Sequence, residues 1–407
     1  MNTELRIAVI GAGPAGVYSS DIFLRQLKKL GEELGLGTEA RIDLFEKLPV
    51  PFGLVRYGVA PDHPSIKFIA SALEKTLDNP DIHLYCDVEF GKDVTLDELL
   101  ERYDAVLFAT GAVEDKPLGL PGADLDGVYG AAKFVEWYDG YPTGAREWPL
   151  DAEEVAVIGG GNVAMDVARS AVRCGAEKVS IVYRRRICDM TAQDAEIAGA
   201  QAEGCEVLEL TAPLAIETGE DGRVSGLRVQ PQIIGEPRRG RPAPRAAATP
   251  ERVIPCERVF VAIGQDIDSK PFEEMGIACK WGRVVTDSDG AVPNFDGLFS
   301  GGDCQTGPAT VIRAINAGRV ASANIDRYLG FDHKIKLDVE LPTVQFKGKH
   351  ECGRCELGER EAGERIHDWN LVEQGLTEEE ARQEASRCLR CDHFGFGAFR
   401  GGRNLEW

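Results

Sequence analysis

The sequence has no apolar run long enough to cross a bilayer, and its first residues lack the pattern of a secretory signal peptide. We therefore expect no membrane insertion and a soluble, cytoplasmic protein. Positive charge is also scarce, because 46 Lys and Arg face 67 Asp and Glu, which gives a net charge of −21. Since binding to a nucleic acid backbone needs clustered Lys and Arg, we expect no nucleic acid partner.

One basic stretch departs from this balance. Its arginines are separated by Gly and Pro, which favours a solvated loop or hairpin tip over a docking patch. They are Arg238, Arg239, Arg241 and Arg245. The stretch lies in a region, Val207 to Val261, that we predict to be β-rich, with turns at Gly219–Gly222 and Gly235–Pro244.

The length of 407 residues predicts two or three domains, and an apolar content of 43% indicates an ordered body. Predicted strands and helices alternate in two successive blocks, the pattern of doubly wound sheets. The first block has strands at 6–10, 41–45 and 105–109 and helices at 14–30 and 66–77; the second has strands at 155–158 and 179–183 around a helix ending near 174. The fold class is therefore α/β, with two doubly wound dinucleotide-binding (Rossmann-like) domains and a C-terminal cysteine-rich tail.

The first strand is followed by a glycine turn of the form G-x-G-x-x-G. Its glycines permit a tight turn, close approach of the backbone to a pyrophosphate, and close packing of helix on strand. The amides and dipole at the start of the next helix then favour phosphate. The residues are Gly11, Gly13, Pro14, Ala15 and Gly16. Glu46 ends the next strand, where a carboxylate can accept both ribose hydroxyls.

The second block repeats the turn as G-x-G-x-x-A, with Gly159, Gly161, Asn162, Val163 and Ala164. No acid stands at the ribose position of this block. Arg184 and Arg185 follow the strand instead, and guanidinium groups can bind a 2′-phosphate. A solvated basic turn is the alternative interpretation. One acid-ended and one arginine-ended fold predict FAD and NADP(H), with hydride transfer that needs stacking and orientation more than a general base.

Longer segments around these motifs resemble known protein families. The segment 49–67 (PVPFGLVRYGVAPDHPSIK) resembles adrenodoxin reductase and bacterial ferredoxin–NADP reductases. The segments 159–169 (GGGNVAMDVAR) and 298–319 (LFSGGDCQTGPATVIRAINAGR) resemble the small subunit of NADPH-dependent glutamate synthase and bifurcating transhydrogenase relatives. The resemblance covers about residues 5 to 330. It implies an NAD(P)H-dependent flavoprotein oxidoreductase.

The resemblance also implies roles for single residues. His63 would pair with Asp166 for orientation and electron-transfer coupling, although His63 taken alone favours a structural histidine. Asn162 and Glu196 would lie at the nicotinamide nucleotide. The residues implied on the FAD side are Glu46 at the adenosine ribose, Leu54 near the flavin, Gly111, Gly302, Asp303 at the ribityl or phosphate region, and Thr310 and Val311 facing the ring. The expected domains are an FAD-binding domain (1–118 and 286–332), an NADP(H)-binding domain (119–285) and a C-terminal extension (333–407).

Residues 1–330 contain no C-x-x-C or C-x4-C pair, which sets aside the thioredoxin and glutathione reductases. Four of the eleven cysteines form two C-x-x-C pairs near the C-terminus: Cys352, Cys355, Cys388 and Cys391. Four thiolates suit an iron–sulfur cluster or a structural zinc ion. The segment 384–391 (EASRCLRC) resembles the cluster motif of glutamate synthase small subunits, which favours a cluster, most simply [4Fe–4S]. In those subunits the motif is N-terminal, so its position here departs from the pattern.

The sequence therefore predicts electron transfer between NADPH and an iron–sulfur partner through FAD and a C-terminal cluster. The partner would be ferredoxin or another iron–sulfur or flavin subunit of a redox complex. Two alternatives stay open: a stand-alone NADPH–ferredoxin reductase with structural zinc, and a non-catalytic flavin-bound subunit.

Overall fold

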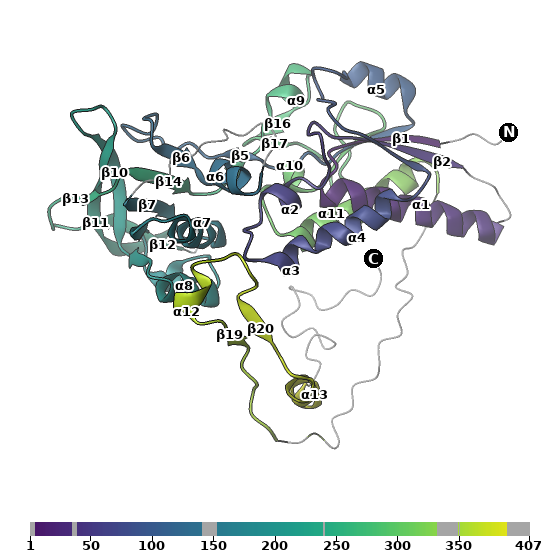
Figure 1. The fold of residues 1–407 in the computed structure, drawn as a ribbon. Helices are drawn as coiled ribbons and strands as arrows, with labels where there is room; N and C mark the ends of the chain where they lie inside the picture. The colour runs from purple at the N-terminus through teal and green to yellow at the C-terminus, as the bar shows by residue number, and fades with distance from the viewer. Residues whose placement is uncertain are drawn as a thin grey trace.

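The computed structural model describes residues 5–34, 39–140, 153–238, 241–331, 349 and 351–388. The first domain is built on a parallel five-stranded sheet (Figure 1). In spatial order its strands are β18 (Leu298–Ser300), β4 (Ala105–Phe108), β1 (Leu5–Ile10), β2 (Ala40–Phe45) and β3 (Ile82–Tyr85). Residues 7–10 of β1 and all of β4 are buried, as their apolar sequences predict.

Two long helices cover one face of this sheet, α1 (Pro14–Leu34) and α11 (Val311–Tyr328). They cross closely at Gly318, where a Cβ would lie 2.5 Å from the carbonyl oxygen of Ala15. Shorter helices complete the domain: α2 (Leu54–Tyr57), α3 (Pro64–Lys67), α4 (Ile69–Leu77), α5 (Leu96–Arg102) and α10 (Asp303–Thr306). The single helix predicted at 66–77 is thus interrupted at Phe68.

The second domain repeats the plan with a second parallel sheet. Its strands, in spatial order, are β6 (Val128–Gly130), β14 (Arg258–Ala262), β7 (Glu154–Gly159), β8 (Lys178–Val182) and β9 (Glu206–Leu208). One face packs against α6 (Ala131–Tyr138), α7 (Asn162–Arg173) and α8 (Asp194–Ala202). Two parallel Rossmann-like sheets confirm the predicted fold class.

An antiparallel sheet covers the other face of the second parallel sheet. It consists of β10 (Thr211–Thr218), β11 (Val224–Arg238), β12 (Arg241–Ala246) and β13 (Arg252–Pro255). The turn predicted across Gly235–Pro244 is wrong, because Gly235 pairs with Ala243 and Ile234 with Pro244 in the ladder. The basic stretch lies at the end of this β11–β12 hairpin, with residues 239–240 outside the described part.

The chain crosses between the domains twice, and the two crossings pair with each other. β5 (Glu114–Asp115) leads out of the first domain and lies antiparallel to β15 (Gln265–Asp266), which leads back. After β15 come α9 (Lys270–Glu274), β16 (Cys279–Lys280) and β17 (Arg283–Val284). Phe272 and Val284 share a core cluster with Ile10 and Phe108 of the first domain. The packing therefore favours ending the second domain at β15 rather than at residue 285.

The C-terminal arm, residues 351–388, extends from the second domain (Figure 1). Its elements are β19 (Gly358–Glu359), α12 (Ala362–Arg365), β20 (Glu373–Gly375) and α13 (Glu378–Arg387). β19 and β20 pair and separate α12, which lies beside α8, from α13, which lies away from the body. Thr377 and Glu380 form a capping box at the start of α13.

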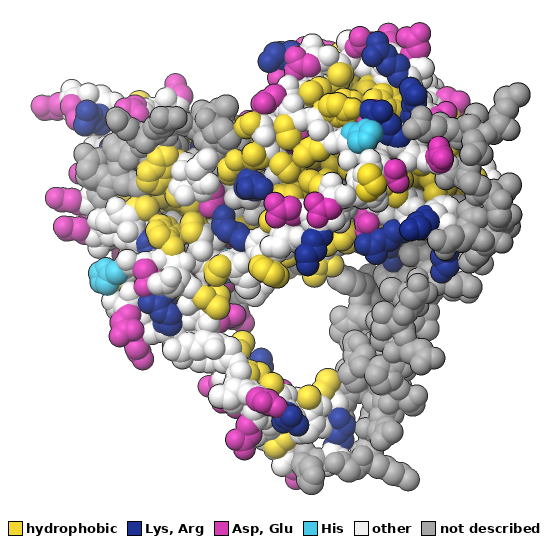
Figure 2. Space-filling view, turned by 45° about the vertical axis from the view of Figure 1, so that its right-hand side comes forward, with side chains coloured by type: hydrophobic (Ala, Val, Ile, Leu, Met, Phe, Trp, Pro, Cys, Tyr) yellow, Lys and Arg dark blue, Asp and Glu magenta, His cyan; other side chains and the backbone are white. Residues whose placement is uncertain are grey.

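The visible surface mixes charged and hydrophobic side chains. Figure 2 shows acidic and basic side chains interspersed over the visible face, with hydrophobic side chains exposed between them. Among the described residues, no helix combines the length and apolar character that a membrane span requires.

Candidate nucleotide sites and the cluster between them

The first glycine turn lies where β1 meets α1. Gly11 has a φ of 107°, and a Cβ there would lie 2.5 Å from the carbonyl oxygen of Ala109. A Cβ at Gly16 would collide with the carbonyl oxygen of Gly11. Gly13 differs, since no heavy atom lies within 4 Å of its Cβ position. The outer glycines are therefore required by the fold itself, whereas Gly13 faces open space that can admit a pyrophosphate.

Glu46 lies beside this turn at the end of β2, with only 7% of its surface exposed. Its carboxylate accepts the N–H of Ala12 (3.0 Å) and the N–H of Leu48 (3.1 Å). Burial raises the pKa of Glu46, although the backbone donors oppose this. Each carboxylate oxygen retains acceptor capacity, so the side chain is held in place and can still receive two ribose hydroxyls.

The remaining FAD-side candidates gather at the same edge of the first sheet. Gly111 follows β4, Gly302 follows β18, and both have a positive φ (77° and 78°). Asp303 begins α10, and burial raises the pKa of its carboxyl group. Thr310 caps α11 by accepting the N–H of Arg313, and Val311 begins that helix. Leu54 begins α2. α1 follows β1 directly, and α11 follows β18 after the short helix α10. In such folds, anions and nucleotides bind at the edge of the sheet where the strands end.

The second glycine turn repeats the geometry of the first. A Cβ at Gly159 would collide with the carbonyl oxygen of Ala262, as one at Gly11 would with that of Ala109. Gly161 caps α7, and the buried Ala164 takes the place of the third glycine. The side chain of Val163 is exposed beside them. Asn162 accepts the N–H of Gln193 through its side-chain oxygen (2.9 Å), which fixes the loop before α8 against the turn.

The arginines after β8 differ in how they are engaged. Arg184 is exposed and makes no hydrogen bond or ion pair with the described residues. Arg185 is half-buried, and its Nε donates to the carbonyl of Pro242 in the β11–β12 hairpin (2.9 Å). Arg186 pairs with Asp189 (2.8 Å). Of the two predicted selectors, Arg184 is therefore the one whose whole guanidinium group can reach a ligand.

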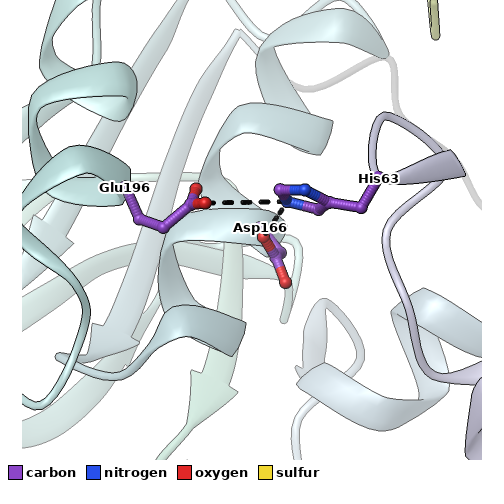
Figure 3. A group of neighbouring side chains, drawn as sticks. All are labelled: His63, Asp166 and Glu196. Atoms are coloured by element: carbon purple, nitrogen blue, oxygen red, sulfur yellow. Dashed lines mark hydrogen bonds and ion pairs between the residues drawn. The ribbon is translucent and has the colours of Figure 1, made fainter. Parts of the chain in front are cut away.

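A polar cluster joins the two domains, and we call it the His63 cluster (Figure 3). His63 precedes α3 in the first domain, Asp166 lies on α7 and Glu196 on α8 of the second. His63 Nε2 lies 3.2 Å from Asp166 Oδ1 and 4.0 Å from Glu196 Oε1. The hydrogen bond with Asp166 raises the pKa of His63, and burial raises the pKa of Glu196. The structure thus brings together three residues that are far apart in the sequence.

Further ion pairs around this cluster were not predicted from the sequence. The buried Asp62 lies 3.2 Å from Arg169 of α7, and Lys67 lies 2.7 Å from Asp139 after α6. Burial raises the pKa of Asp139 to about 6 despite Lys67. The segment 62–67 therefore binds the second domain at three points. All of it lies inside the motif quoted above, but its partners are distant in the sequence.

The cysteine pairs lie in the C-terminal arm. Cys352 and Cys355 pack against α13, and Cys388 caps the end of that helix. The N–H of Cys355 donates to Glu384 (2.6 Å). Within the described residues, the three sulfur atoms do not all lie within 4.8 Å of one another. Cys391 lies outside the described residues.

Comparison with known proteins identifies the family of this chain. Residues 5–318 match the model of the pyridine nucleotide-disulphide oxidoreductase family. The chain belongs to this family. It is 33% identical over 338 residues to the glutamate synthase [NADPH] small chain of Halomonas elongata, covering 80% of this chain and 68% of that one. It is 45% identical over 165 residues to the mitochondrial NADPH:adrenodoxin oxidoreductase of Drosophila melanogaster, covering 40% and 33%.

The solved structure of Mycobacterium tuberculosis FprA in complex with NADPH superposes with a TM-score of 0.71 at 25% identity, covering 81% of this chain and 85% of that one. The family and the names of the relatives confirm the predicted class, the NAD(P)H-dependent flavoprotein oxidoreductases, and both halves of the predicted resemblance. The chain spans about half the length of the first curated relatives that it matches.

Proposed function

We propose that this protein transfers electrons between NADPH and an iron–sulfur partner, with FAD at the first glycine turn, NADPH at the second and a cluster in the C-terminal arm. One observation carries the proposal. In both turns a Cβ on the first glycine would collide with a backbone carbonyl oxygen, but the strand after the first turn is followed by Glu46 and the strand after the second by Arg184. Bound FAD would accept a hydride from the nicotinamide ring and release electrons singly.

The first site fits FAD. The open space at Gly13 can receive the pyrophosphate, and Glu46 is held to accept the adenosine ribose. We assign Asp303 to the ribityl or phosphate region, and Thr310 and Val311 to the flavin ring, because they begin helices at the same sheet edge. Leu54, Gly111 and Gly302 would line the flavin.

The second site fits NADPH rather than NADH. Gly159, Gly161 and Ala164 would let the pyrophosphate approach α7, with Asn162 and Val163 beside it. Arg184 would donate charge-assisted hydrogen bonds to the 2′-phosphate, since its side chain has no competing contact among the described residues. Arg185 would contribute only its terminal nitrogens to the 2′-phosphate, because its Nε already donates to the carbonyl of Pro242 in the hairpin.

The His63 cluster would set how the two sites face each other. His63 comes from the first domain and its partners Asp166 and Glu196 from the second, so the cluster fixes the domains at the place where the two rings must meet. We assign His63 and Asp166 to orientation and electronic coupling. No proton transfer to either residue is needed for hydride transfer.

The C-terminal arm would hold the iron–sulfur cluster through Cys352, Cys355, Cys388 and Cys391. The glutamate synthase relative is a small chain and the other relative is named for adrenodoxin, which supports a partner subunit or an iron–sulfur protein as acceptor or donor. The seven described cysteines outside the arm form no disulfide with one another, which supports a reducing compartment such as the cytoplasm.

The test is reduction of the bound flavin by NADPH and by NADH, followed by absorbance, in wild type and in Arg184→Ser. Loss of one charge-assisted hydrogen bond of about 1.5–3 kcal/mol should reduce the preference for NADPH by about 10- to 150-fold. Arg223→Ser, at an exposed turn, is the matched control and should keep the wild-type preference. Equal rates with both nucleotides in wild type would refute the selector role.

A second measurement separates the proposed cluster from the zinc alternative. Iron, acid-labile sulfide and zinc are measured on the anaerobically purified protein together with its flavin. Iron with sulfide supports the electron-transfer chain proposed here. Zinc alone would instead indicate a stand-alone NADPH–ferredoxin reductase with a structural metal site.

A further inference from the structure

A buried arginine of the C-terminal arm binds the second domain. The side chain of Arg365 in α12 is only 3% exposed, and its Nε donates to Glu203 Oε1 (2.7 Å). Its other contacts, to Glu359 Oε2 (2.6 Å) and the carbonyl of Arg360 (3.2 Å), lie within the arm. Glu203 caps the end of α8, and its side chain is fully buried.

Glu203 is shared with two arginines of α7. Arg169 donates to it with both Nε (3.1 Å) and a terminal nitrogen (3.0 Å), and Arg173 donates to the same carboxylate. Although burial opposes it, these arginines lower the pKa of Glu203. Three buried guanidinium groups hold this carboxylate in one position. If one of them is removed, the other two must compensate more of its negative charge.

The same Arg169 reaches the His63 cluster. Its other terminal nitrogen lies 2.8 Å from Glu196 Oε2. The terminal nitrogen that donates to Glu203 also lies 3.2 Å from Asp62, the residue before His63. Direct contacts therefore run from Arg365 through Glu203 and Arg169 to Glu196, which lies 4.0 Å from His63.

A second set of contacts joins the arm to α7 independently. The Nε of Arg173 donates to the carbonyl of Asp368 (3.1 Å), and its guanidinium group lies 5.7 Å from the ring centre of Trp369. The ring of Trp369 lies 5.8 Å from that of Tyr138, which ends α6. The arm therefore contacts the end of α7 through Arg173 as well as the end of α8 through Arg365.

We propose that Arg365 is a positioning residue for the nicotinamide site: the docked arm fixes Glu203 and Arg169, and through them the placement of Glu196 beside His63. The proposal rests on the proposed function, because it assigns the His63 cluster to the NADPH side. It means that the segment carrying the cysteines helps to build the site from which it would receive electrons.

The charges around His63 predict in which direction its pKa should change when Arg365 is removed. The groups that face it are Asp166 from α7, Glu196 from α8 and Asp62 from its own segment. Without Arg365, Arg169 must compensate more of the negative charge of Glu203 and therefore compensates less of the negative charge of Glu196. Glu196 then attracts the protonated imidazole more strongly, so the midpoint of the His63 titration should move upward.

The experiment uses the full-length flavin-bound protein with Arg365→Gln and Arg365→Lys. Two readouts are taken: the NMR titration of the His63 imidazole, and the KM and kcat for NADPH. Arg365→Gln should raise the titration midpoint and change KM about tenfold with a smaller change in kcat. Arg365→Lys, which keeps the charge, should recover part of both effects. Glu359→Gln is the matched control, because it removes an exposed contact of the same arginine inside the arm and should stay within about twofold.

Glu196→Gln supplies the decisive comparison. If the effect runs through Glu196, Arg365→Gln should no longer shift the His63 titration in the Glu196→Gln background. An unchanged His63 titration in both Arg365 variants, or the same shift with and without Glu196, overturns the proposal. Failure of wild type to accept electrons from NADPH would overturn the proposed function instead, and the titration would still test Arg365.

Discussion

Gly13 offers a test in which stability and cofactor binding change in opposite directions. Its Cβ position has no heavy atom within 4 Å, and its φ is outside the left-handed region. Replacing Gly by Ala at a compatible position stabilises a protein by about 0.4–1 kcal/mol, because the unfolded chain loses freedom. For a domain of roughly 150–250 residues this corresponds to a rise in Tm of about 1–4 °C. The flavin-free Gly13→Ala protein should therefore be at least as stable as wild type.

FAD binding should respond in the opposite way. The added methyl group would occupy the space into which the pyrophosphate must move to reach the amides of α1. Losing one charge-assisted hydrogen bond of about 1.5–3 kcal/mol weakens binding about 10- to 150-fold, and losing two weakens it further. The assay is titration of the flavin-free protein with FAD, together with a thermal melt of the same sample.

Gly16→Ala is the matched comparison. Its Cβ would collide with the backbone carbonyl of Gly11, so this variant should lose stability even without flavin. Should Gly13→Ala bind FAD as tightly as wild type, the pyrophosphate does not lie against Gly13, and the assignment of the first turn is refuted.

Three further predictions concern the domain interface and the arm. Because the folded-state pKa of His63 is raised above 6.5, its pairing with Asp166 should stabilise the protein most below that pH and lose this effect as the pH rises through the folded pKa; the difference in Tm between wild type and His63→Gln, measured against pH, checks this. For Asp139, burial raises the folded-state pKa from 3.8 to about 6, so its contribution to stability is greatest below about pH 4 and is lost as the pH rises through the folded pKa. Asp139→Asn should flatten the Tm profile between about pH 4 and 6, and an unchanged slope would contradict this role of Asp139. Cys352→Ser should lower bound iron and sulfide at unchanged flavin content, whereas Cys188→Ser, an exposed cysteine outside the arm, should leave all three unchanged.

The glycine turns were predictable because their constraint is local. Only glycine fits at Gly11, where the strand and helix meet at a positive φ, and the same requirement recurs at the second turn. The residue that ends the next strand follows within the same unit, so Glu46 and Arg184 could be named as candidates. Arg184 and Arg185 could not be ranked, because the difference depends on a hairpin carbonyl at Pro242.

The domain interface could not be predicted in the same way. Asp62 and Arg169 are separated by more than a hundred residues, and their contact depends on how the domains are placed. The end of the second domain is also difficult to predict, for a physical reason. The residues after β15 are not marked by a change in composition, yet Phe272 packs into the first domain.

The charged residues of α7 and α8 show why this interface and the arm must be considered together. Arg169 contacts Asp62 of the first domain, Glu196 of the His63 cluster and Glu203, the carboxylate that the arm binds. A single guanidinium group with these three partners cannot move toward one without weakening another. Buried ion pairs of this kind add little net stability, but they penalise every arrangement in which one partner is missing. The relative placement of the two domains and the docking of the arm therefore depend on each other. This dependence links the position of the cysteines to the geometry of the proposed nicotinamide site.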